Sequence, residues 1–398
     1  MSEERKLRIG LVIDVFSPER GGGEGYCVRL AKELLRRGHE VHVFADRWDE
    51  AEGVAYHRVP ARAPGKTLPM IRFALRSKKA VSAFDLDVVH AVGKALGMNL
   101  FNSHGGVEAR WLAQNFRSIE SPLYRIWKKT CRYLSLRHHF IARLERIQYT
   151  DPGVVRYVAI SDMLARHMRE TYDLSEEKLR IVYNGVDTET FSPANRARHR
   201  DAVRRELGTP SGAPVVFHVT NNFRLKGLKP LVRALRRVRE NPRGRGAELW
   251  VLGRGRRRPY ARLASKLGVR EAVRFLGWRE KPERFYASAD VYAHPTFYDA
   301  CSLSVLEALA SGLPAVTTET NGASGYIDDG VQGFVLPDAA DDAALAEGLL
   351  KALEPDFQAK AGIAARARAE EYPLSRNTEE MIAVYREVAA GRQGGSAS

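Results

Sequence analysis

The sequence predicts an α/β protein built from two doubly wound domains that face each other across a cleft. Two observations support this fold class. Short apolar runs alternate with amphipathic helical segments in both halves of the chain, and the alternation restarts near Val215 after a turn-rich segment. A length of 398 residues also favours two domains over one. We place the domains at 1–182 and 183–372, and we expect a C-terminal helix in 373–398 to pack back toward the first domain.

The first half of the chain opens with a βαβ unit. A buried strand is predicted over 9–16, and a glycine turn then leads into an amphipathic helix that ends at Arg37. A second strand follows over 41–45, and unbroken apolar runs predict two more at 88–92 and 157–160. Strands that are apolar throughout are typical of parallel sheets covered by helices on both faces.

The second half repeats this alternation. The predicted strands are VVFHVT, ELWVLG, VRFLG, VYAHPT, PAVTT and FVLP, and helices separate them, the first being LKPLVRALRRVRE. A last helix is predicted from about 376 to 388, followed by a frayed tail. Because ligands of open α/β sheets bind beyond the carboxyl ends of the strands, the loops that follow strands are expected to border the cleft.

Composition narrows the function classes. The three cysteines have no metal-ligand spacing, so neither a disulfide framework nor a zinc site is predicted. No window approaches the roughly 18 apolar residues of a membrane-spanning helix, and the N-terminus has no signal-peptide pattern, so we expect a cytoplasmic protein. A formal net charge of +15 predicts attraction to polyanions, whether nucleic acid, an anionic membrane or phosphorylated substrates.

Residues 110–146 differ from both predicted domains. This insert in the first domain interleaves arginine and lysine with tryptophan, tyrosine and phenylalanine, as in YRIWKKTCRY. A basic aromatic stretch of this kind is typical of a helix that lies in a membrane interface. A surface helix pair with its aromatic side chains in the core produces the same pattern, and both interpretations stay open.

The first loop, ERGGGEG, places glycines ahead of a helix N-terminus, where free N–H groups and the helix dipole favour an anion. It matches the dinucleotide-binding pattern GxGxxG poorly, because Tyr26 stands where the third glycine would fall. A nicotinamide-dependent dehydrogenase is therefore weakly supported. A tight strand-to-helix turn without any ligand explains the same residues.

Three further residues are candidates for the cleft. His104, in LFNSHGG, follows an apolar run and precedes two glycines, which let backbone approach a ligand closely. Arg224 and Lys226 follow a predicted strand just before a helix, where two cations and free N–H groups suit a diphosphate. A structural role is the alternative in each case, since lone histidines are often structural and a chain with 63 lysines and arginines contains many cation pairs.

The segment FDLDVVH contains Asp85 and Asp87 in a DxD spacing, which holds a divalent metal in some enzymes. Both aspartates precede a predicted strand instead of following it. They should therefore lie at the end of the sheet that is remote from the cleft, and we interpret them as loop residues.

Several motifs occur in an order that resembles the retaining, group-1 glycosyltransferases of family 4, which have the GT-B fold. The motifs span nearly the whole chain: GGGE, RRGHEVHVF, HGG, YNGVDTETFSP, RLKG, VRFLG, YASADVYAHPT and VLEALASGLPAVTT. Within that family the chain is most similar to the lipopolysaccharide core glucosyltransferases, through FRLKG, HPTFYD and the basic aromatic insert after HGG.

The resemblance implies transfer from a nucleotide-diphosphate sugar with retained anomeric configuration and no required metal or other cofactor. It implies that Gly21 and Gly22 approach the donor diphosphate or the acceptor, and that His104 lies near the reacting sugar. Lys226 and Arg224 fall at the cationic clamp for the diphosphate. The match of Arg224 is weaker, because the arginine that often adjoins this lysine in the family is here a leucine.

Asp299 and Glu307 stand at the two ends of the E-x7-E motif of the family. The resemblance implies that Asp299 holds hydroxyls of the transferred sugar and, with His104, forms the catalytic set, while Glu307 binds the nucleotide ribose. Asp299 replaces a glutamate and is one methylene shorter. The N–H groups at Ser302 and Leu303 are implied to receive the phosphates. No side chain is a compelling covalent nucleophile, so departure and attack on one face of the sugar is favoured.

We therefore expect a hexosyltransferase that moves glucose from UDP-glucose onto a lipid-linked saccharide such as lipopolysaccharide core, at the inner face of the cell membrane. GDP-mannose or another nucleotide sugar is an alternative donor. A degenerate homologue that only binds nucleotides is an alternative of another class. A nucleic-acid partner is not expected, because the chain has no RNP, KH or helix-turn-helix signature.

Overall fold

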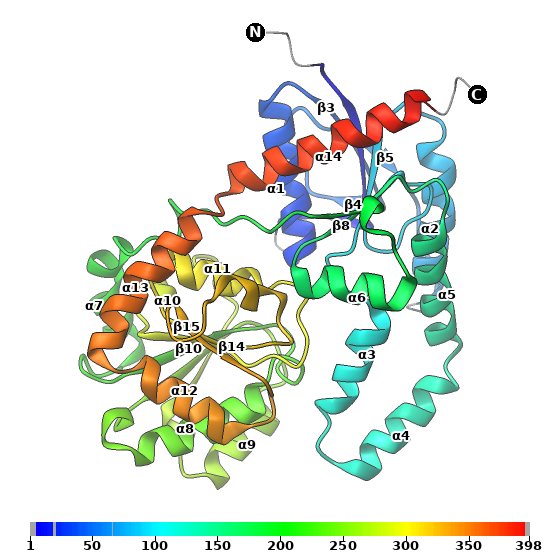
Figure 1. The fold of residues 1–398 in the computed structure, drawn as a ribbon. Coiled ribbons are helices and arrows are strands. Elements are labelled where there is room, and N and C mark those ends of the chain that lie inside the picture. Colours follow the sequence, from blue (N-terminus) through cyan, green and yellow to red (C-terminus); the bar gives the residue numbers. More distant parts are fainter. Residues whose placement is uncertain (1–4, 19–20, 66, 395–398) are drawn as a thin grey trace. The chain divides into compact units, whose positions relative to one another are not determined.

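The computed structural model describes residues 5–18, 21–65 and 67–394. The chain divides into two compact units. The N-terminal unit contains the residues up to Arg110, Ile126–Tyr183 and the residues from Ser375 onward, and the C-terminal unit contains Trp111–Arg125 and Asn184–Leu374. Each unit combines a parallel sheet with helices, so the predicted α/β class is confirmed (Figure 1).

The N-terminal unit is built on a seven-stranded sheet with the strand order β5-β3-β1-β6-β7-β8-β9, in which all neighbours run parallel. The order reverses between β1 and β6, which is the topological switch point of a doubly wound sheet. The strands are β1 (Arg8–Val12), β3 (Glu40–Ala45), β5 (Ala55–Arg58), β6 (Val88–Val92), β7 (Leu100–Asn102), β8 (Arg156–Ala159) and β9 (Leu179–Ile181). The main helices are α1 (Gly22–Arg36), α2 (Leu68–Val81), α5 (Leu136–Thr150) and α6 (Asp162–Tyr172).

One predicted strand of this unit is split in two. We expected a single strand over 9–16, but β1 ends at Val12, and Val15–Phe16 forms a short strand, β2, that pairs with β4 (Arg47–Trp48) in a separate two-stranded sheet. The chain bends at Asp14, whose carbonyl oxygen accepts two backbone hydrogen bonds of 3.1 and 3.4 Å. The apolar residues on both sides of the bend are buried, so the run resembles one strand although the exposed Asp14 interrupts it.

The last helix, α14 (Leu374–Gly394), is longer than the predicted 376–388, and all of it from Ser375 onward belongs to the N-terminal unit. The buried hydroxyl of Tyr385 lies 2.8 Å from Nδ1 of His90 in β6. Glu387 forms ion pairs with Arg156 (2.7 Å) on β8 and with Arg180 (2.9 Å) on the neighbouring edge strand β9. The helix therefore completes the core of this unit.

The C-terminal unit repeats the same design with a six-stranded parallel sheet in the order β12-β11-β10-β13-β14-β15. Its switch point lies between β10 and β13. The strands are β10 (Val215–Val219), β11 (Glu248–Leu252), β12 (Val273–Gly277), β13 (Val291–His294), β14 (Ala315–Thr318) and β15 (Gly333–Leu336). The helices are α7 (Asn195–Leu207), α8 (Leu228–Glu240), α9 (Arg258–Lys266), α10 (Glu283–Tyr286), α11 (Leu303–Ala310), α12 (Asp342–Ala352) and α13 (Pro355–Glu370).

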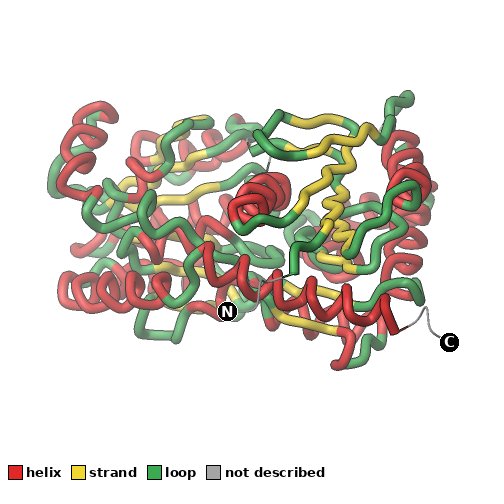
Figure 2. The backbone as a smooth tube through the Cα atoms, turned by 90° about the horizontal axis from the view of Figure 1, so that it is seen from above, coloured by secondary structure: helices red, strands yellow, loops and turns green. Residues whose placement is uncertain are grey.

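The core of this unit follows from the period of its apolar residues. Helix α8 buries leucine and valine at helical spacing, including Leu231 and Leu235, against strand residues such as Val251 and against Leu349 of α12. In Figure 2 the strands of the chain lie between helices, as this burial on both sheet faces requires. The unbroken apolar strands predicted from the sequence are thus explained by helices on both sides.

The predicted insert 110–146 is divided between the units. Its helices are α3 (Glu108–Arg117) and α4 (Pro122–Tyr133), followed by α5, and Trp111–Arg125 groups with the C-terminal unit instead of the N-terminal domain to which we had assigned it. Ion pairs explain the grouping: Glu120 binds Arg233 at 2.8 Å, and Arg117 binds Asp338 at 2.8 Å. The sequence shows the charges of this segment but not their partners.

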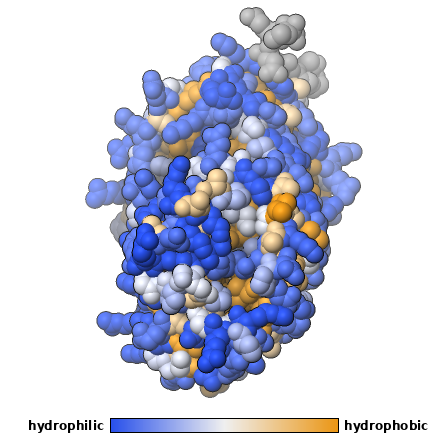
Figure 3. All heavy atoms as spheres, turned by 90° about the vertical axis from the view of Figure 1, so that its left-hand side faces the viewer, coloured by the Kyte–Doolittle hydropathy of each residue, from blue (hydrophilic) through white to orange (hydrophobic). Residues whose placement is uncertain are grey.

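The surface agrees with the composition. Hydrophilic side chains dominate the face shown in Figure 3, with smaller hydrophobic areas between them, which is ordinary for a folded domain. Within the described part of the chain, every helix is too short or too polar to cross a bilayer.

Candidate functional site

The C-terminal unit brings Lys226 and Asp299 together beyond the carboxyl ends of β10 and β13, at its switch point. The loop after β10 ends at Gly227, and the loop after β13 begins at Pro295. A Cβ atom on Gly227 would lie only 1.8 Å from the carbonyl oxygen of Pro295, and the φ angle of Gly227 is +71°. Only glycine fits both demands, so the close contact between the two loops depends on this residue.

Lys226 and Asp299 form an ion pair across these loops. The ammonium nitrogen of Lys226 lies 2.5 Å from Oδ2 of Asp299 and 3.1 Å from the carbonyl oxygen of Tyr298. Both side chains are largely buried, with 19% and 20% of their surfaces exposed. An ammonium group has three N–H donors, so one donor remains for a ligand after these two contacts.

The ion pair sets the ionisation of Asp299. Burial raises the pKa of this carboxyl group, but the nearby charge of Lys226 and a contact of 3.3 Å with Nε2 of His294 outweigh burial and hold the pKa well below its usual range. Asp299 is therefore an ionised hydrogen-bond acceptor at neutral pH.

Glu307 lies in α11, and its Oε2 accepts a hydrogen bond of 2.8 Å from the hydroxyl of Tyr286. Burial, followed by the charge of Glu307, raises the pKa of Tyr286 well above its ordinary value, so this tyrosine stays protonated and donates. Asp299 lies in the preceding loop, before the helix begins at Leu303. The two carboxylates of the predicted motif thus flank the start of one helix.

The start of α11 is partly occupied by the protein itself. The N–H group of Ser302, which we predicted as a phosphate ligand, donates to Oδ1 of Asn321 at 3.2 Å. No side chain caps the helix at Ser302. In the first helical turn the N–H group of Val305 donates to the carbonyl oxygen of Ser302 at 3.2 Å, so the N–H groups of Leu303 and Ser304 are the donors that an anion can use here.

Arg224 has partners of a different kind. Its guanidinium group donates to the carbonyl oxygen of Asn115 (2.9 Å), to Oδ1 of the same residue (2.8 Å) and to Oγ of Ser118 (2.9 Å). These residues belong to the segment Trp111–Arg125. The structure therefore uses Arg224 to hold this segment, whereas the prediction places it in the diphosphate clamp beside Lys226.

The N-terminal unit holds the remaining predicted residues. Gly21 caps the N-terminus of α1 and Gly22 is its first residue. A Cβ atom on Gly23 would lie 3.3 Å from Cβ of His104, so glycine at this position lets the turn approach the histidine. The ring of Tyr26 lies against His104 with 4.3 Å between centroids.

His104 is a neutral imidazole in this setting. Burial, with a smaller effect of Arg29, lowers its pKa to about 3. Its Nε2 atom is buried and has no hydrogen-bond partner among the described residues. We had identified His104 and two glycines of the turn, but not Gly23 or Tyr26. The signal was present, because Tyr26 occupies the position at which the loop departs from GxGxxG.

Asp85 and Asp87 precede β6, so they lie at the amino ends of the strands, whereas the glycine turn follows the carboxyl end of β1. Asp87 accepts hydrogen bonds from the side chain of Arg5 (2.7 Å) and the N–H group of Arg8 (2.8 Å). Within the described residues, acidic, histidine and cysteine side chains form no group of three that is suited to a metal ion. The DxD spacing thus has a structural explanation.

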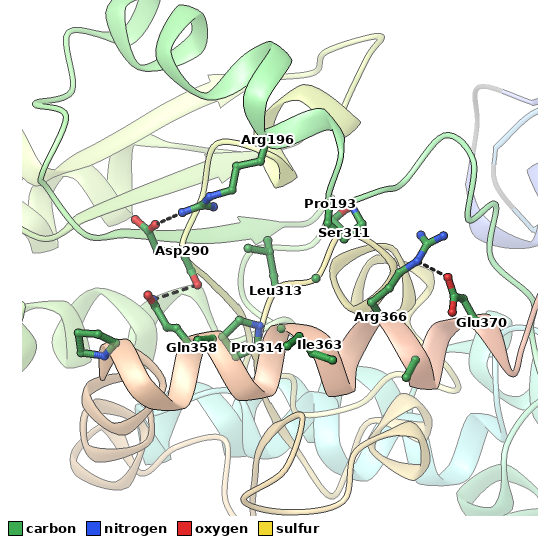
Figure 4. A pocket seen from close by; sticks show the side chains of 15 residues that line it. Pro193, Arg196, Asp290, Ser311, Leu313, Pro314, Gln358, Ile363, Arg366 and Glu370 are labelled. Atoms are coloured by element: carbon green, nitrogen blue, oxygen red, sulfur yellow. Dashed lines mark hydrogen bonds and ion pairs between the residues drawn. The ribbon is translucent and has the colours of Figure 1, made fainter.

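A cavity of about 660 Å³ lies on the C-terminal unit at the amino ends of β13 and β14, where Figure 4 shows its lining residues. Its polar side chains are bound to protein groups. Asp290 pairs with Arg196 at 3.1 Å, and Arg366 pairs with Glu370 at 2.7 Å while also donating to three main-chain carbonyls. The cavity is remote from the carboxyl ends of the strands and offers no unsatisfied charged group to a ligand.

Two doubly wound units, each built on a parallel sheet, match the GT-B fold. Solved structures confirm this fold. The structure of WaaG, described as a glycosyltransferase involved in lipopolysaccharide biosynthesis, matches with a TM-score of 0.80 at 23% identity and covers 95% of this chain and 99% of that chain. Sucrose-phosphate synthase from Thermosynechococcus elongatus matches with a TM-score of 0.77 at 18% identity, over 97% of this chain and 100% of that chain.

Sequence comparison identifies the family. The model for glycosyltransferase family 4 matches residues 20–190, and a model for glycosyl transferases group 1 matches residues 213–355. A D-inositol 3-phosphate glycosyltransferase of Nocardiopsis dassonvillei is 30% identical and covers 94% of this chain and 91% of that protein. The lipopolysaccharide glucosyltransferase WaaG of Escherichia coli (strain K12) is 26% identical, over 84% of this chain and 86% of that protein. The chain belongs to the family 4, group-1 glycosyltransferases and is a nucleotide-sugar-dependent hexosyltransferase.

Proposed function

We propose that this enzyme moves glucose from UDP-glucose onto a lipid-linked saccharide, with retained anomeric configuration and without a metal ion. The observation that supports the donor site best is the Lys226–Asp299 pair at the switch point beside the start of α11. The similarity to WaaG, which is named as a lipopolysaccharide glucosyltransferase, supports the choice of sugar and acceptor.

At the nucleotide end of the site, positively charged groups and N–H donors stabilise the leaving group. As the bond between sugar and diphosphate breaks, negative charge grows on the departing nucleotide. The free donor of Lys226 and the first N–H groups of α11 stabilise it, because they are already oriented in a largely buried site. Glu307, positioned by Tyr286, accepts hydrogen bonds from the ribose hydroxyls. Preorganised cations and dipoles of this kind supply the stabilisation for which other transferases use a metal.

At the sugar end of the site, protein groups accept hydrogen bonds from the sugar hydroxyls. Asp299 is ionised and accepts hydrogen bonds from hydroxyls of the transferred glucose. His104, neutral and against the glycine turn, orients the reacting sugar from the N-terminal unit. We assign no covalent nucleophile. A diphosphate oxygen takes the proton of the attacking acceptor hydroxyl on the face from which the nucleotide leaves, so the configuration is retained.

The first test replaces Lys226 with alanine and measures transfer from UDP-glucose to a core-type acceptor. We expect kcat/KM to fall by about 10² to 10³, the usual loss when one preorganised charge-stabilising donor is removed. Lys351→Ala is the matched control, since this lysine is exposed, pairs with Glu347 on the same helix and lies over the ring of Phe334. Unchanged transfer by the Lys226 variant would refute the clamp. Loss of activity in EDTA would refute metal independence.

The donor is tested separately by thermal shift with UDP, UDP-glucose, GDP and GDP-mannose. At equal ligand concentration, a ligand that binds only the folded protein raises the midpoint of thermal unfolding more when its affinity is higher, so the preferred nucleotide gives the largest shift. We expect the order UDP-glucose, then UDP, then the guanosine compounds. A larger shift with GDP-mannose would replace glucose by mannose and leave the catalytic residues as assigned.

For the location, we propose that α4 and the start of α5 bind an anionic membrane surface, with the enzyme at the inner face of the cell membrane. Large apolar side chains are exposed there: Trp127 by 55%, Leu134 by 73% and Leu136 by 86%. Basic residues lie among them: Lys128, Lys129, Arg132 and Arg137. Exposed apolar groups with surrounding cations suit the headgroup region of anionic lipids.

Co-sedimentation with vesicles tests this surface. We expect binding to vesicles that contain anionic lipid, little binding to neutral vesicles, and weaker binding at high salt. Trp127→Ala with Leu134→Ser should reduce binding and leave transfer to a soluble acceptor unchanged. Equal binding to neutral and anionic vesicles, or no binding, would refute the electrostatic membrane contact.

The comparisons also support a second candidate acceptor, D-inositol 3-phosphate. Several relatives are named D-inositol 3-phosphate glycosyltransferases, including one from Nocardia farcinica at 31% identity over 84% of this chain. The +15 charge of the chain suits a phosphorylated acceptor of either kind. Parallel assays with D-inositol 3-phosphate and with a lipid-linked core saccharide decide between them, and faster transfer to inositol phosphate would displace the lipid-linked acceptor.

A further inference from the structure

His294 is the last residue of β13 and is fully enclosed behind the donor site. Its side chain is 2% exposed, and its Nε2 atom lies 3.3 Å from Oδ2 of Asp299. Its Nδ1 atom lies 3.2 Å from the hydroxyl of Tyr292 in the same strand. The ring of His218 stands behind it, with 5.6 Å between centroids. Both nitrogens of His294 therefore have partners, and one partner is the carboxylate assigned to the sugar.

The protonation of His294 follows from these contacts. Burial lowers the pKa of this imidazole, so it is neutral and carries one N–H group. If the hydrogen were on Nδ1, the lone pair of Nε2 would face the ionised Asp299. The hydrogen is therefore on Nε2, from which it donates to the carboxylate, while Nδ1 lies against the hydroxyl oxygen of Tyr292.

A row of hydroxyl groups continues from these contacts. The hydroxyl of Tyr292 donates to Oγ of Ser304 at 2.6 Å. The hydroxyls of Ser304 and Ser302 lie 2.8 Å apart, and either of them can be the donor. Polar contacts thus connect the first turn of α11, through Tyr292 and His294, to Asp299.

The contacts of Asp299 fall on one oxygen. Oδ2 accepts from both Lys226 and His294, so Oδ1 is the oxygen that can face a sugar hydroxyl. The main chain of Asp299 is fixed as well, since its N–H donates to Thr320 (3.0 Å) and its carbonyl accepts from Gly322 (2.8 Å). With Lys226 as its single partner, the carboxylate could pivot on Oδ2 and move Oδ1 to several positions. A second donor, held on a rigid strand, fixes the position of Oδ1.

We propose that His294 is a positioning residue for sugar transfer. It fixes the plane of the Asp299 carboxylate so that Oδ1 meets the transferred sugar. The inference rests on the proposed donor site. It assigns to His294 an effect on the sugar and none on the nucleotide, which distinguishes it from a residue that merely supports the fold.

Three variants test the proposal: His294→Leu, His294→Gln and Tyr292→Phe. Leucine removes the donor, whereas the glutamine amide keeps an N–H group in reach of Asp299. For each variant we would measure kcat and KM with UDP-glucose, Kd for UDP and for UDP-glucose by calorimetry, and the thermal midpoint. UDP lacks the sugar, so the ratio of the two Kd values reports the sugar contacts.

We expect His294→Leu to lower kcat by about 10-fold or more and to reduce the advantage of UDP-glucose over UDP, with Kd for UDP within about twofold of wild type. His294→Gln should restore most of kcat. Tyr292→Phe should have a smaller effect in the same direction. Lower stability of the leucine variant could not by itself produce this pattern. UDP binds only the folded protein, so an unchanged Kd for UDP shows that the site is still folded.

Three results would overturn the inference: unchanged kcat in His294→Leu, an equal loss of UDP and UDP-glucose affinity, or a glutamine variant as impaired as the leucine variant. The proposed function fails in a different way. If the wild-type chain binds UDP-glucose no better than UDP and transfers no glucose, the donor assignment is wrong. If the wild type transfers glucose and His294→Leu does so equally well, only the positioning role is wrong.

Discussion

The two ends of strand β13 each carry an aspartate, and the two are built in opposite ways. Asp290, just before the strand, has both oxygens fully engaged. Its Oδ1 accepts from Arg196 (3.1 Å) and Arg200 (2.8 Å). Its Oδ2 accepts from Arg204 (2.7 Å) and from the N–H group of Val215 (2.9 Å). These contacts use about all the acceptor capacity of a carboxylate.

Asp299, five residues beyond the strand, has its protein contacts on Oδ2 and one fifth of its side chain exposed. Both aspartates are largely buried and form ion pairs with basic residues, so burial and charge pairing alone do not distinguish them. The difference is that Asp290 has no acceptor left for a ligand, whereas Asp299 has one. A saturated carboxylate at the amino end of a strand supports the fold, and an unsaturated one at the carboxyl end is available for a substrate.

The largest effect is expected from Asp290→Ala. Arg204 is 2% exposed and would be left as a buried, unpaired cation, which typically costs about 3 to 5 kcal/mol in the free energy of unfolding. Denaturant unfolding measures this loss, and kcat of the folded fraction should be unchanged. A stable variant with impaired transfer would reverse our assignment of the two ends.

Asp299→Ala should do the opposite. We expect kcat/KM to fall by about 10² to 10³, equivalent to about 2.7 to 4 kcal/mol in the transition state, because the ionised acceptor for the sugar is lost. The midpoint of thermal unfolding should fall less than in Asp290→Ala, since the side chain of Lys226 is 19% exposed whereas that of Arg204 is 2% exposed. Steady-state kinetics beside a melting curve gives both quantities. An unfolded variant would mean that Asp299 is structural in the same way as Asp290.

Asp299→Glu sharpens the comparison by restoring the length usual in the family. The extra methylene pushes the carboxylate toward His294 and changes its reach to the sugar. We expect kcat/KM with UDP-glucose to fall by about 10-fold, or about 1.4 kcal/mol. Competing assays with UDP-glucose, UDP-galactose and GDP-mannose show whether the loss is specific to glucose. Improved transfer of glucose would show that the shorter side chain is not matched to this sugar.

Tyr286→Phe tests the nucleotide end of the site. It removes the hydrogen bond to Glu307, which is worth about 1 kcal/mol, so Kd for UDP should rise by roughly fivefold. The advantage of UDP-glucose over UDP should stay constant, in contrast to the His294 variants. Calorimetry with both ligands measures this. If the sugar contribution changes and the nucleotide contribution does not, the assigned roles of Glu307 and Asp299 are exchanged.

The smallest effect concerns pH. The pKa of Asp299 is held below its ordinary value of 3.8, so the ion pair contributes stability that is fully present above that value and is lost as the pH falls below it. The stability difference between wild type and Asp299→Asn should therefore be constant from pH 7 to pH 5 and should shrink below about pH 4. A difference that already declines between pH 7 and pH 5 would show that the carboxyl group is not strongly paired.

Sequence patterns predicted most of the elements because burial on both faces of a parallel sheet leaves a clear apolar signal. The helix 228–240 and the strand 88–92 match α8 and β6 at both ends. The prediction was wrong for 9–16, since the chain bends at the exposed Asp14 and the ladder is interrupted there, although the apolar residues on both sides are buried. Local hydrogen bonds of the main chain leave no trace in hydrophobicity.

Residue roles were harder to predict than elements, because they depend on partners distant in sequence. The sequence placed Arg224 beside Lys226, but its guanidinium group binds Asn115, over a hundred residues earlier. His294 was visible in HPTFYD only as part of a motif. Its importance comes from two contacts, with Asp299 and Tyr292, that require the strand to end where it does.

The contact between Gly227 and Pro295 has a consequence for the energetics of binding. It locks two loops together, so Lys226 and Asp299 are already paired before any donor arrives. A nucleotide sugar therefore meets a site whose conformational entropy was lost during folding, and its binding energy is not spent on ordering these loops. Gly227, which touches no ligand itself, thus increases the affinity that the site can have for a nucleotide sugar.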